Sequence, residues 1–248
     1  MAADQAPPPR YDVAERYGPL VHRSVHHASL LLLAGSLIFV VGMVVTQVGY
    51  GSSYSLRDNY ISDLGAVHCG TVNGTGAFGS GGHYVCSPWY LVFDVSLVVL
   101  GVCLVLAVLL LRTAFPARRT RSLGLLLLAL TGIGTAGVGV FPEDVNINAH
   151  VASAITAFVC GGLALVVLGI AMFRDTRWDG FRAYSILSGF VSLAAIVLFV
   201  TKTYLYLGVG GMERLIVAPI TLWAIVVGVH LMRIPTYAPR VLPKSTGE

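Results

Sequence analysis

The sequence predicts an all-α fold: a polytopic membrane protein built as a bundle of six transmembrane helices. Of its 248 residues, 56% are hydrophobic and only 11% are charged, whereas soluble domains carry about a quarter of charged residues. Six apolar stretches are long enough to supply the ~20 residues that cross a bilayer. None of them alternates with a period of two, so the pattern does not favour a β-barrel.

The six spans follow one another with mostly short connections. We expect them at Ala28–Val48, Tyr90–Leu111, Leu123–Val140, Ala149–Phe173, Ala183–Leu205 and Leu215–Met232. They form one membrane domain, residues 28–232, between an N-terminal segment, 1–27, and a tail, 233–248. The first stretch is long for a signal peptide and follows acidic residues, so we expect it to be retained as a span.

Basic residues predict the orientation, because cytoplasmic loops are enriched in lysine and arginine. One side holds most of them: Arg10, Arg16, Arg23, Arg112, Arg118, Arg119, Arg121, Arg174, Arg177, Arg182, Arg233, Arg240 and Lys244. Only Arg57, Lys202 and Arg214 fall on the other side. Both termini are therefore expected in the cytoplasm, and the protein in the cell membrane as a multi-pass protein. This asymmetry explains the pI near 9.0, so we expect membrane lipids as partners and no nucleic acid.

The longest connection is the outer loop, residues 49–89. It contains Cys69 and Cys86, and a cysteine pair on an oxidising face predicts a disulfide, with two free thiols as the alternative. Within the loop, the polar run Tyr54–Val67 is expected to form a short helix that dips toward the membrane, capped by Asp58 or Asn59.

The third span is rich in glycine, and Gly132 and Gly139 lie two turns apart on one face. Small residues let membrane helices approach closely, so we expect a tightly packed central helix. The alternative is that the glycines leave room for a ligand tail. Trp178 is expected in the inner aromatic belt. Trp223 falls in the middle of the sixth span, where its indole N–H needs a partner.

Most unusual polar residues lie on one side of the spans, the outer side. They are Asn59, Ser62, Asp63, Asp94, Glu143, Asp144, Asn146, His150, Lys202, Glu213 and Arg214. Ionisable groups near a bilayer are costly and often functional. Their concentration on one face predicts a site there.

Asp63, Asp144 and His150 are the candidate catalytic or metal-binding residues. Aspartate and histidine suit divalent metals and proton transfer, and a turn separates Asp144 from His150 by six residues. We predict no resident cofactor, and a divalent metal on these three residues is the alternative. Other interpretations are also open: Asp63 as a helix cap, the acidic residues as partners of a helix dipole, and His150 as a structural residue. We expect only one histidine, His150, to contribute on this face.

The remaining candidates are ligand-binding residues: Asn59, Ser62, Asp94, Lys202, Glu213 and Arg214. Asp94 and Lys202 each lie about one turn inside a span, where they would form ion pairs or extend to the interface. Arg214 suits a phosphate or carboxylate, because a guanidinium binds both with two hydrogen bonds. The alternative for Arg214 is an interfacial anchor.

Three runs appear in a fixed order: NYISDLG at Asn59–Gly65, GIGTAGVGVFPEDVNINAH ending at His150, and GGMERLIVAPITLW, which contains Glu213–Arg214. Over roughly Ala28–Met232 the chain resembles the uncharacterised prokaryotic membrane family known as domain of unknown function 998. More distantly it is similar to Frag and DRAM-like membrane proteins, which implies a lipid-related role by analogy only. Neither resemblance implies a reaction.

The sequence leaves three functions open. The first is a membrane protein whose outer polar pocket binds or moves a lipid or a small polar solute. The second is an intramembrane lipid hydrolase or transferase that uses Asp63, Asp144 and His150, with Ser62 as a nucleophile. The third is a structural or assembly subunit, either as a homo-oligomer or in a larger membrane complex. No G-x-S-x-G, H-E-x-x-H, C-x-x-C or P-loop motif occurs.

Overall fold

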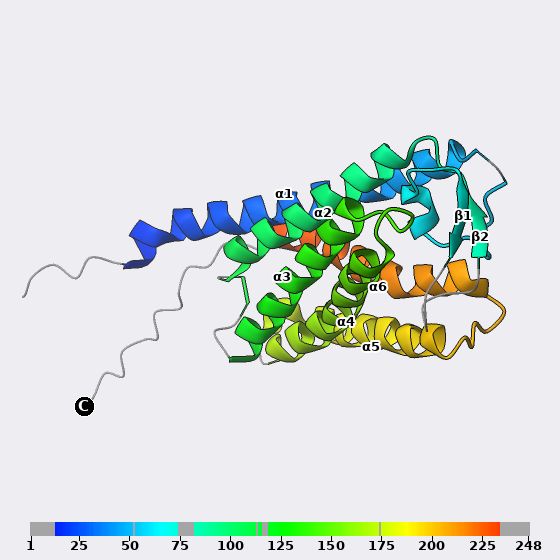
Figure 1. Cartoon of the computed structure of the whole chain (residues 1–248). Helices are drawn as coiled ribbons and strands as arrows, with labels where there is room; N and C mark the ends of the chain where they lie inside the picture. The colour runs from blue at the N-terminus through cyan, green and yellow to red at the C-terminus, as the bar shows by residue number, and fades with distance from the viewer. Residues whose placement is uncertain are drawn as a thin grey trace, which may run out of the picture.

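Six long helices form a ring in the computed structural model, which describes residues 13–51, 53–73, 82–112, 114–115, 119–173 and 175–233 (Figure 1). The helices are α1 (Val13–Val48), α2 (Tyr90–Leu111), α3 (Arg119–Val140), α4 (Ile147–Ala171), α5 (Phe181–Val200) and α6 (Gly208–Arg233). All six are long and apolar enough to cross a membrane, which confirms the predicted fold class. Of the predicted N-terminal segment, 1–27, and tail, 233–248, residues 1–12 and 234–248 lie outside the described residues.

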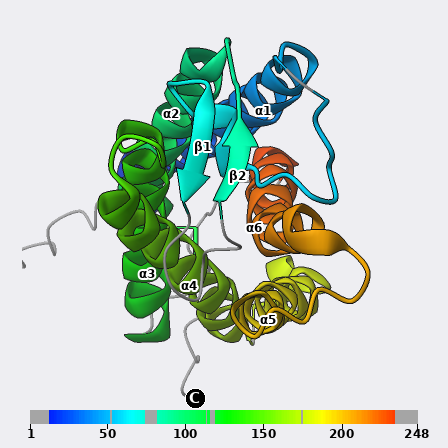
Figure 2. The same cartoon turned by 45° about the vertical axis from the view of Figure 1, so that its right-hand side comes forward.

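Each helix packs on the next in the chain, and α6 closes the ring against α1. Figure 2 shows this ring with the short hairpin of β1 (Gly70–Asn73) and β2 (Gly82–Val85) lying across one end. We call this the loop end, because it carries residues 49–51, 53–73, 82–89, 141–146 and 201–207. The other end is called the opposite end, and α1 begins there and α6 ends there (Figure 1).

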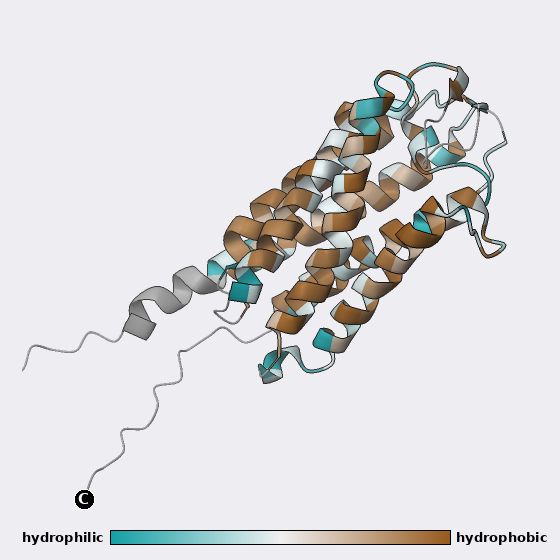
Figure 3. Cartoon of the chain, turned by 60° about the horizontal axis from the view of Figure 1, so that its bottom comes forward, coloured by the Kyte–Doolittle hydropathy of each residue, from teal (hydrophilic) through white to brown (hydrophobic). Residues whose placement is uncertain are grey.

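Hydropathy follows the helices closely. Apolar residues dominate their length, and polar residues gather at their ends (Figure 3). The glycines of α3 sit where neighbours approach most closely: a Cβ at Gly132 would meet the backbone of Gly101 on α2, and one at Gly134 would meet Ala157 on α4. The expectation of a tightly packed α3 is therefore confirmed. The Trp223 indole donates to the Ser185 hydroxyl (2.8 Å), the partner that its depth required.

Three helix ends differ most from the prediction. α1 begins at Val13 rather than at Ala28, so the described part of the predicted N-terminal segment, 1–27, continues the first helix. α5 ends at Val200 rather than near Leu205, because the chain turns there with a positive φ at Lys202 (56°). α6 begins at Gly208, so the segment expected as a loop before the sixth span forms its first turns instead. Glu213 and Arg214 thus lie inside α6 and face the outer loop.

The outer loop folds back onto the bundle. Its run Ser62–Gly65 forms a single 3-10 turn, η1, whose four residues are all buried. This confirms a short helical element, although no side chain caps it, so the capping role predicted for Asp58 or Asn59 was wrong. The predicted disulfide joins Cys69 and Cys86 and links the two ends of the β1–β2 hairpin.

Candidate functional site

Asp63 lies at the centre of the loop end and is fully buried. One carboxylate oxygen, Oδ2, accepts from the Asn59 side-chain amide (2.9 Å) and from the Tyr60 backbone N–H (3.1 Å). The other oxygen, Oδ1, lies 2.7 Å from Nε2 of His83 on β2. These hydrogen bonds fix the carboxylate, so that Oδ1 points toward His83.

Glu143 comes from the turn between α3 and α4 and reaches the same place. Its side chain is buried and forms hydrogen bonds with Ser62 and Asp63. Its second oxygen, Oε1, is buried and has no hydrogen-bond partner among the described residues. Burial, together with the neighbouring Asp63 charge, raises the pKa of Glu143 well above its usual range.

Asp63, His83 and Glu143 form a cluster of metal-ligating groups. One ligand atom from each of the three lies within 4.8 Å of the others. They come from three separate segments: η1, β2 and the α3–α4 turn. We call this set the Asp63–His83–Glu143 cluster.

Glu213 and Arg214 connect α6 to the outer loop. The Glu213 carboxylate accepts the backbone N–H groups of Ile61 and Ser62, at the start of η1. Arg214 donates to the carbonyls of Leu56 and Asn59 (3.2 and 3.1 Å) and to the Tyr54 hydroxyl.

These contacts answer the question that the sequence left open for Arg214. Its Nη1 and Nη2 atoms hold the loop and the guanidinium lies over the Tyr54 ring, whereas Nε is buried without a hydrogen-bond partner among the described residues. Arg214 thus anchors the loop to α6. Burial raises the pKa of Tyr54 despite the adjacent guanidinium, so its hydroxyl keeps the proton that it donates to the Tyr60 carbonyl (2.7 Å).

The predicted grouping of Asp63, Asp144 and His150 does not form a metal-ligand set. Asp144 instead accepts from the backbone N–H groups of Val67 and His68 and contacts the His68 ring. Burial opposes ionisation of Asp144, but these N–H donors outweigh it and lower its pKa. His150 contacts the Phe141 carbonyl (2.8 Å). Asp144 therefore fastens the loop to the α3–α4 turn.

The remaining predicted residues divide between the site and its surroundings. Ser62 and Asn59 contact the cluster, as described above. Asp94 is buried on α2 against Gly65, where an added Cβ would clash with its carboxylate. Lys202 lies in an exposed turn beyond α5, so its predicted place inside the fifth span was wrong. Asn146 caps α4 by accepting the Ala149 N–H.

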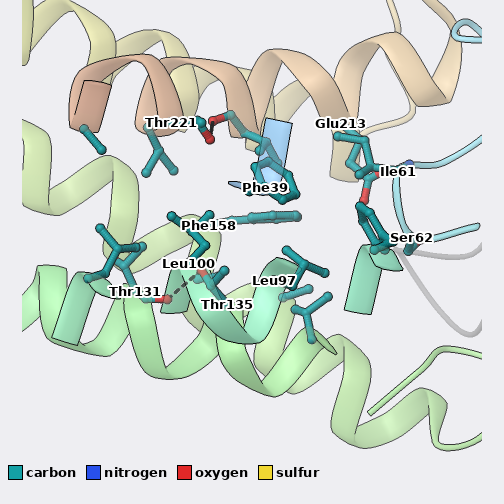
Figure 4. A pocket seen from close by; sticks show the side chains of 18 of the residues that line it. Phe39, Ile61, Ser62, Leu97, Leu100, Thr131, Thr135, Phe158, Glu213 and Thr221 are labelled. Atoms are coloured by element: carbon teal, nitrogen blue, oxygen red, sulfur yellow. Dashed lines mark hydrogen bonds between the residues drawn. The ribbon is translucent and has the colours of Figure 1, made fainter. Parts of the chain in front are cut away.

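A cavity of about 70 Å³ lies inside the ring, next to the buried polar residues of the loop end. Its lining is mainly apolar, with Phe39, Leu97 and Phe158 facing inward (Figure 4). Ser62 and Glu213 lie together at one end of it, and Thr131 and Thr221 lie toward the other. His150 also contributes to the lining.

His83 is the main residue that sequence reasoning missed. The expectation that His150 is the single histidine contributing on this face was wrong, because His83 contacts Asp63 there. Its position depends on the pairing of β1 with β2, in which Val72 lies opposite His83, and on the disulfide beside it. The nearby Cys86 was the available signal, because a disulfide fixes the adjoining backbone.

Residues 33–230 match the family of proteins of unknown function called DUF998, and the chain belongs to that family. No curated protein and no solved structure matches the chain. The suspected likeness to Frag and DRAM-like proteins has no support in these comparisons.

Proposed function

We propose that this membrane protein binds an amphiphilic molecule of the bilayer, with only a short stretch of its apolar part entering the central cavity of about 70 Å³. The observation that carries this proposal is the polarity of the cavity: its apolar walls end in Ser62, His150 and Glu213 on the side of the loop end. Ligand pockets are commonly apolar with a few placed polar groups that fix orientation. A lipid or similar amphiphile is divided in the same way, into an apolar part and a polar group.

We further propose that the loop end faces the outside of the cell. Among the described residues, Arg23, Arg112, Arg119, Arg121, Arg177, Arg182 and Arg233 all lie toward the opposite end. This is the distribution that the positive-inside rule associates with the cytoplasm. A disulfide at the loop end agrees with an oxidising compartment. A cysteine in place of Tyr206, 97% exposed, should react in intact cells with a membrane-impermeant maleimide.

The binding proposal is tested by filling the cavity. Val217 on α6 lines it, and Val226 lies on the same helix but is partly exposed on its outer surface. Val217→Phe should lower the amount of amphiphile that co-purifies in mild detergent by at least about tenfold, because the ring occupies the binding space. Val226→Phe adds the same volume elsewhere and should retain the wild-type amount.

Native mass spectrometry of the wild type and the two variants gives the readout. A bound amphiphile in the wild type and in Val226→Phe, but not in Val217→Phe, supports the proposal. Equal retention in all three, or none in the wild type, would overturn it.

A second function, hydrolysis or group transfer on a lipid, is favoured by one observation. The Asp63–His83–Glu143 cluster adjoins Ser62, which also lines the cavity, so an amphiphile's polar group would lie beside groups able to move a proton. Asp63→Asn should then stop fatty-acid release from a lipid extract, while His68→Ala should not. If the wild type releases no fatty acid from the extract, binding remains the proposed function.

A further inference from the structure

We propose that Asp63, His83 and Glu143 hold a divalent transition-metal ion, Zn²⁺ by the chemistry of the donor set. This inference does not depend on the proposed amphiphile, because it concerns buried polar residues of the loop end and not the apolar cavity. It also differs from the metal site on Asp63, Asp144 and His150 that the sequence left open as an alternative.

The donor atoms converge from three directions. The three ligand atoms lie within 4.8 Å of one another, and Asp63 Oδ1 and His83 Nε2 are 2.7 Å apart. A tetrahedral zinc ion with bonds of about 2.0–2.2 Å separates its ligand atoms by about 3.4 Å. Small side-chain rotations therefore suffice to bring the three atoms onto one ion.

Glu143 gives an independent sign of a missing positive partner. Its Oε1 is buried and unpartnered among the described residues, and the residue is only 7% exposed. A buried carboxylate oxygen without a donor is destabilising. A cation between Glu143, Asp63 and His83 would satisfy this oxygen.

The local charges match a divalent ion. In the ion pairs of the described residues, neither Asp63 nor Glu143 meets a lysine or arginine. Arg214 on α6 directs its Nη1 atom to the loop carbonyls of Leu56 and Asn59 and not to these carboxyls. With an ion bound, two deprotonated carboxyls and a neutral imidazole would carry two negative charges, which a divalent cation balances.

The surroundings orient the ligands as outer-shell partners do at known metal sites. Asn59 and the Tyr60 N–H hold Oδ2 of Asp63, which directs Oδ1 toward His83. Ser62 bonds Glu143. The Tyr60 ring packs against the His83 ring, with centroids 5.4 Å apart. Three protein ligands leave a fourth position for water or a ligand group, the arrangement of reactive rather than structural zinc sites.

The test uses the full chain purified in mild detergent, stripped with a chelator and then equilibrated with ZnCl₂. Elemental analysis should find one Zn²⁺ per chain in the wild type. His83→Ala and Glu143→Gln should each lower this to about a tenth or less, because two ligands bind zinc far more weakly than three. His68→Ala, which removes an exposed histidine of the same loop, should keep one ion.

A second measurement on the wild type guards against misfolded variants. Zinc-edge X-ray absorption should detect one imidazole and carboxylate oxygens, and no sulfur. A wild type without zinc would mean that the two carboxyls share a proton instead, and it would overturn the proposal. Zinc retained in His83→Ala, zinc lost in His68→Ala, or a sulfur ligand would overturn it equally.

Discussion

The two ends of the bundle are closed by different chemistry. At the opposite end, Trp178 is fully buried and stacks on Phe115 with ring centroids 4.8 Å apart, and His230 stacks on Phe181 at 3.8 Å. At the loop end, the closing layer contains the buried carboxyls of Asp63, Glu143 and Glu213.

The buried residues of the opposite end serve packing, whereas those of the loop end include candidates for function. Aromatic contacts close the opposite end by burying apolar area, which needs no charged group. The loop end could be closed in the same way, yet it keeps groups whose burial is costly. Trp178 was expected in the interfacial belt; its complete burial makes it a core residue instead. Among the costly groups of the loop end, Glu213 has backbone partners, whereas Glu143 keeps an oxygen without one.

The largest expected effect lies at the opposite end. Trp178→Ala should lower the free energy of unfolding in mixed micelles by about 3–5 kcal/mol, the usual cost of emptying a buried tryptophan site. Zinc binding should remain, because the change lies at the other end of the bundle. Trp89→Ala, a half-exposed residue, is the control and should have a much smaller effect. Loss of zinc in Trp178→Ala would break the proposed separation of the two ends.

Arg214→Ala should have the next largest effect. It frees the carbonyls of Leu56 and Asn59 and the Tyr54 hydroxyl, at a cost of about 2–3 kcal/mol for hydrogen bonds from a charged group. Limited proteolysis should show faster cleavage within residues 53–61. Arg182→Ala, on an exposed ion pair at the opposite end, should change stability by less than about 0.5 kcal/mol. Equal effects of the two changes would contradict the anchoring role.

Gly210→Ala tests how closely α6 approaches the outer loop. An added Cβ would clash with the backbone carbonyl of Asn59, and backbone cannot rotate out of the way. We expect a loss of about 1–3 kcal/mol and a weaker zinc affinity, since Asn59 supports Asp63. The matched control is Gly70→Ala, where an added Cβ meets nothing within 4 Å. An unchanged melting temperature for Gly210→Ala would show that the loop is not seated on α6.

The smallest effect is expected from Asp144→Ala, and it should depend on pH. Because N–H donors lower the pKa of Asp144 in the folded protein, its contribution is present above the unfolded pKa of about 3.9 and is lost as pH falls through the folded value. The variant should therefore be less stable than the wild type at pH 7, by up to about 1 kcal/mol. The difference should vanish in strong acid, and a difference that grows there would contradict this sign.

The spans could be predicted because a bilayer imposes length and hydropathy on every helix that crosses it. The same rule did not give the end of α5, because apolar residues return at Tyr204 and Leu205, beyond the polar residues 201–203 where the backbone leaves the helix. The run Asn59–Gly65 and the pair Glu213–Arg214 were recognised as belonging to one region. Their roles were not predictable, because the partners of Arg214 are backbone carbonyls that carry no residue-specific signal.

The Asp63–His83–Glu143 cluster brings together residues that lie at different distances along the sequence. Asp63 and His83 are 20 residues apart, and a hairpin and a disulfide bring them together. The sequence places Glu143 among the polar residues of this face, but it predicts the neighbouring Asp144 as the candidate ligand. Both lie in the same turn, and only the backbone geometry decides which of the two points inward.

Anomalous scattering at the zinc edge tests the central claim most directly, on crystals of the full chain grown with Zn²⁺. The account predicts one strong peak about 2.0–2.2 Å from Asp63, His83 and Glu143. No peak there, or a peak beside His68 and Asp144 instead, would contradict it.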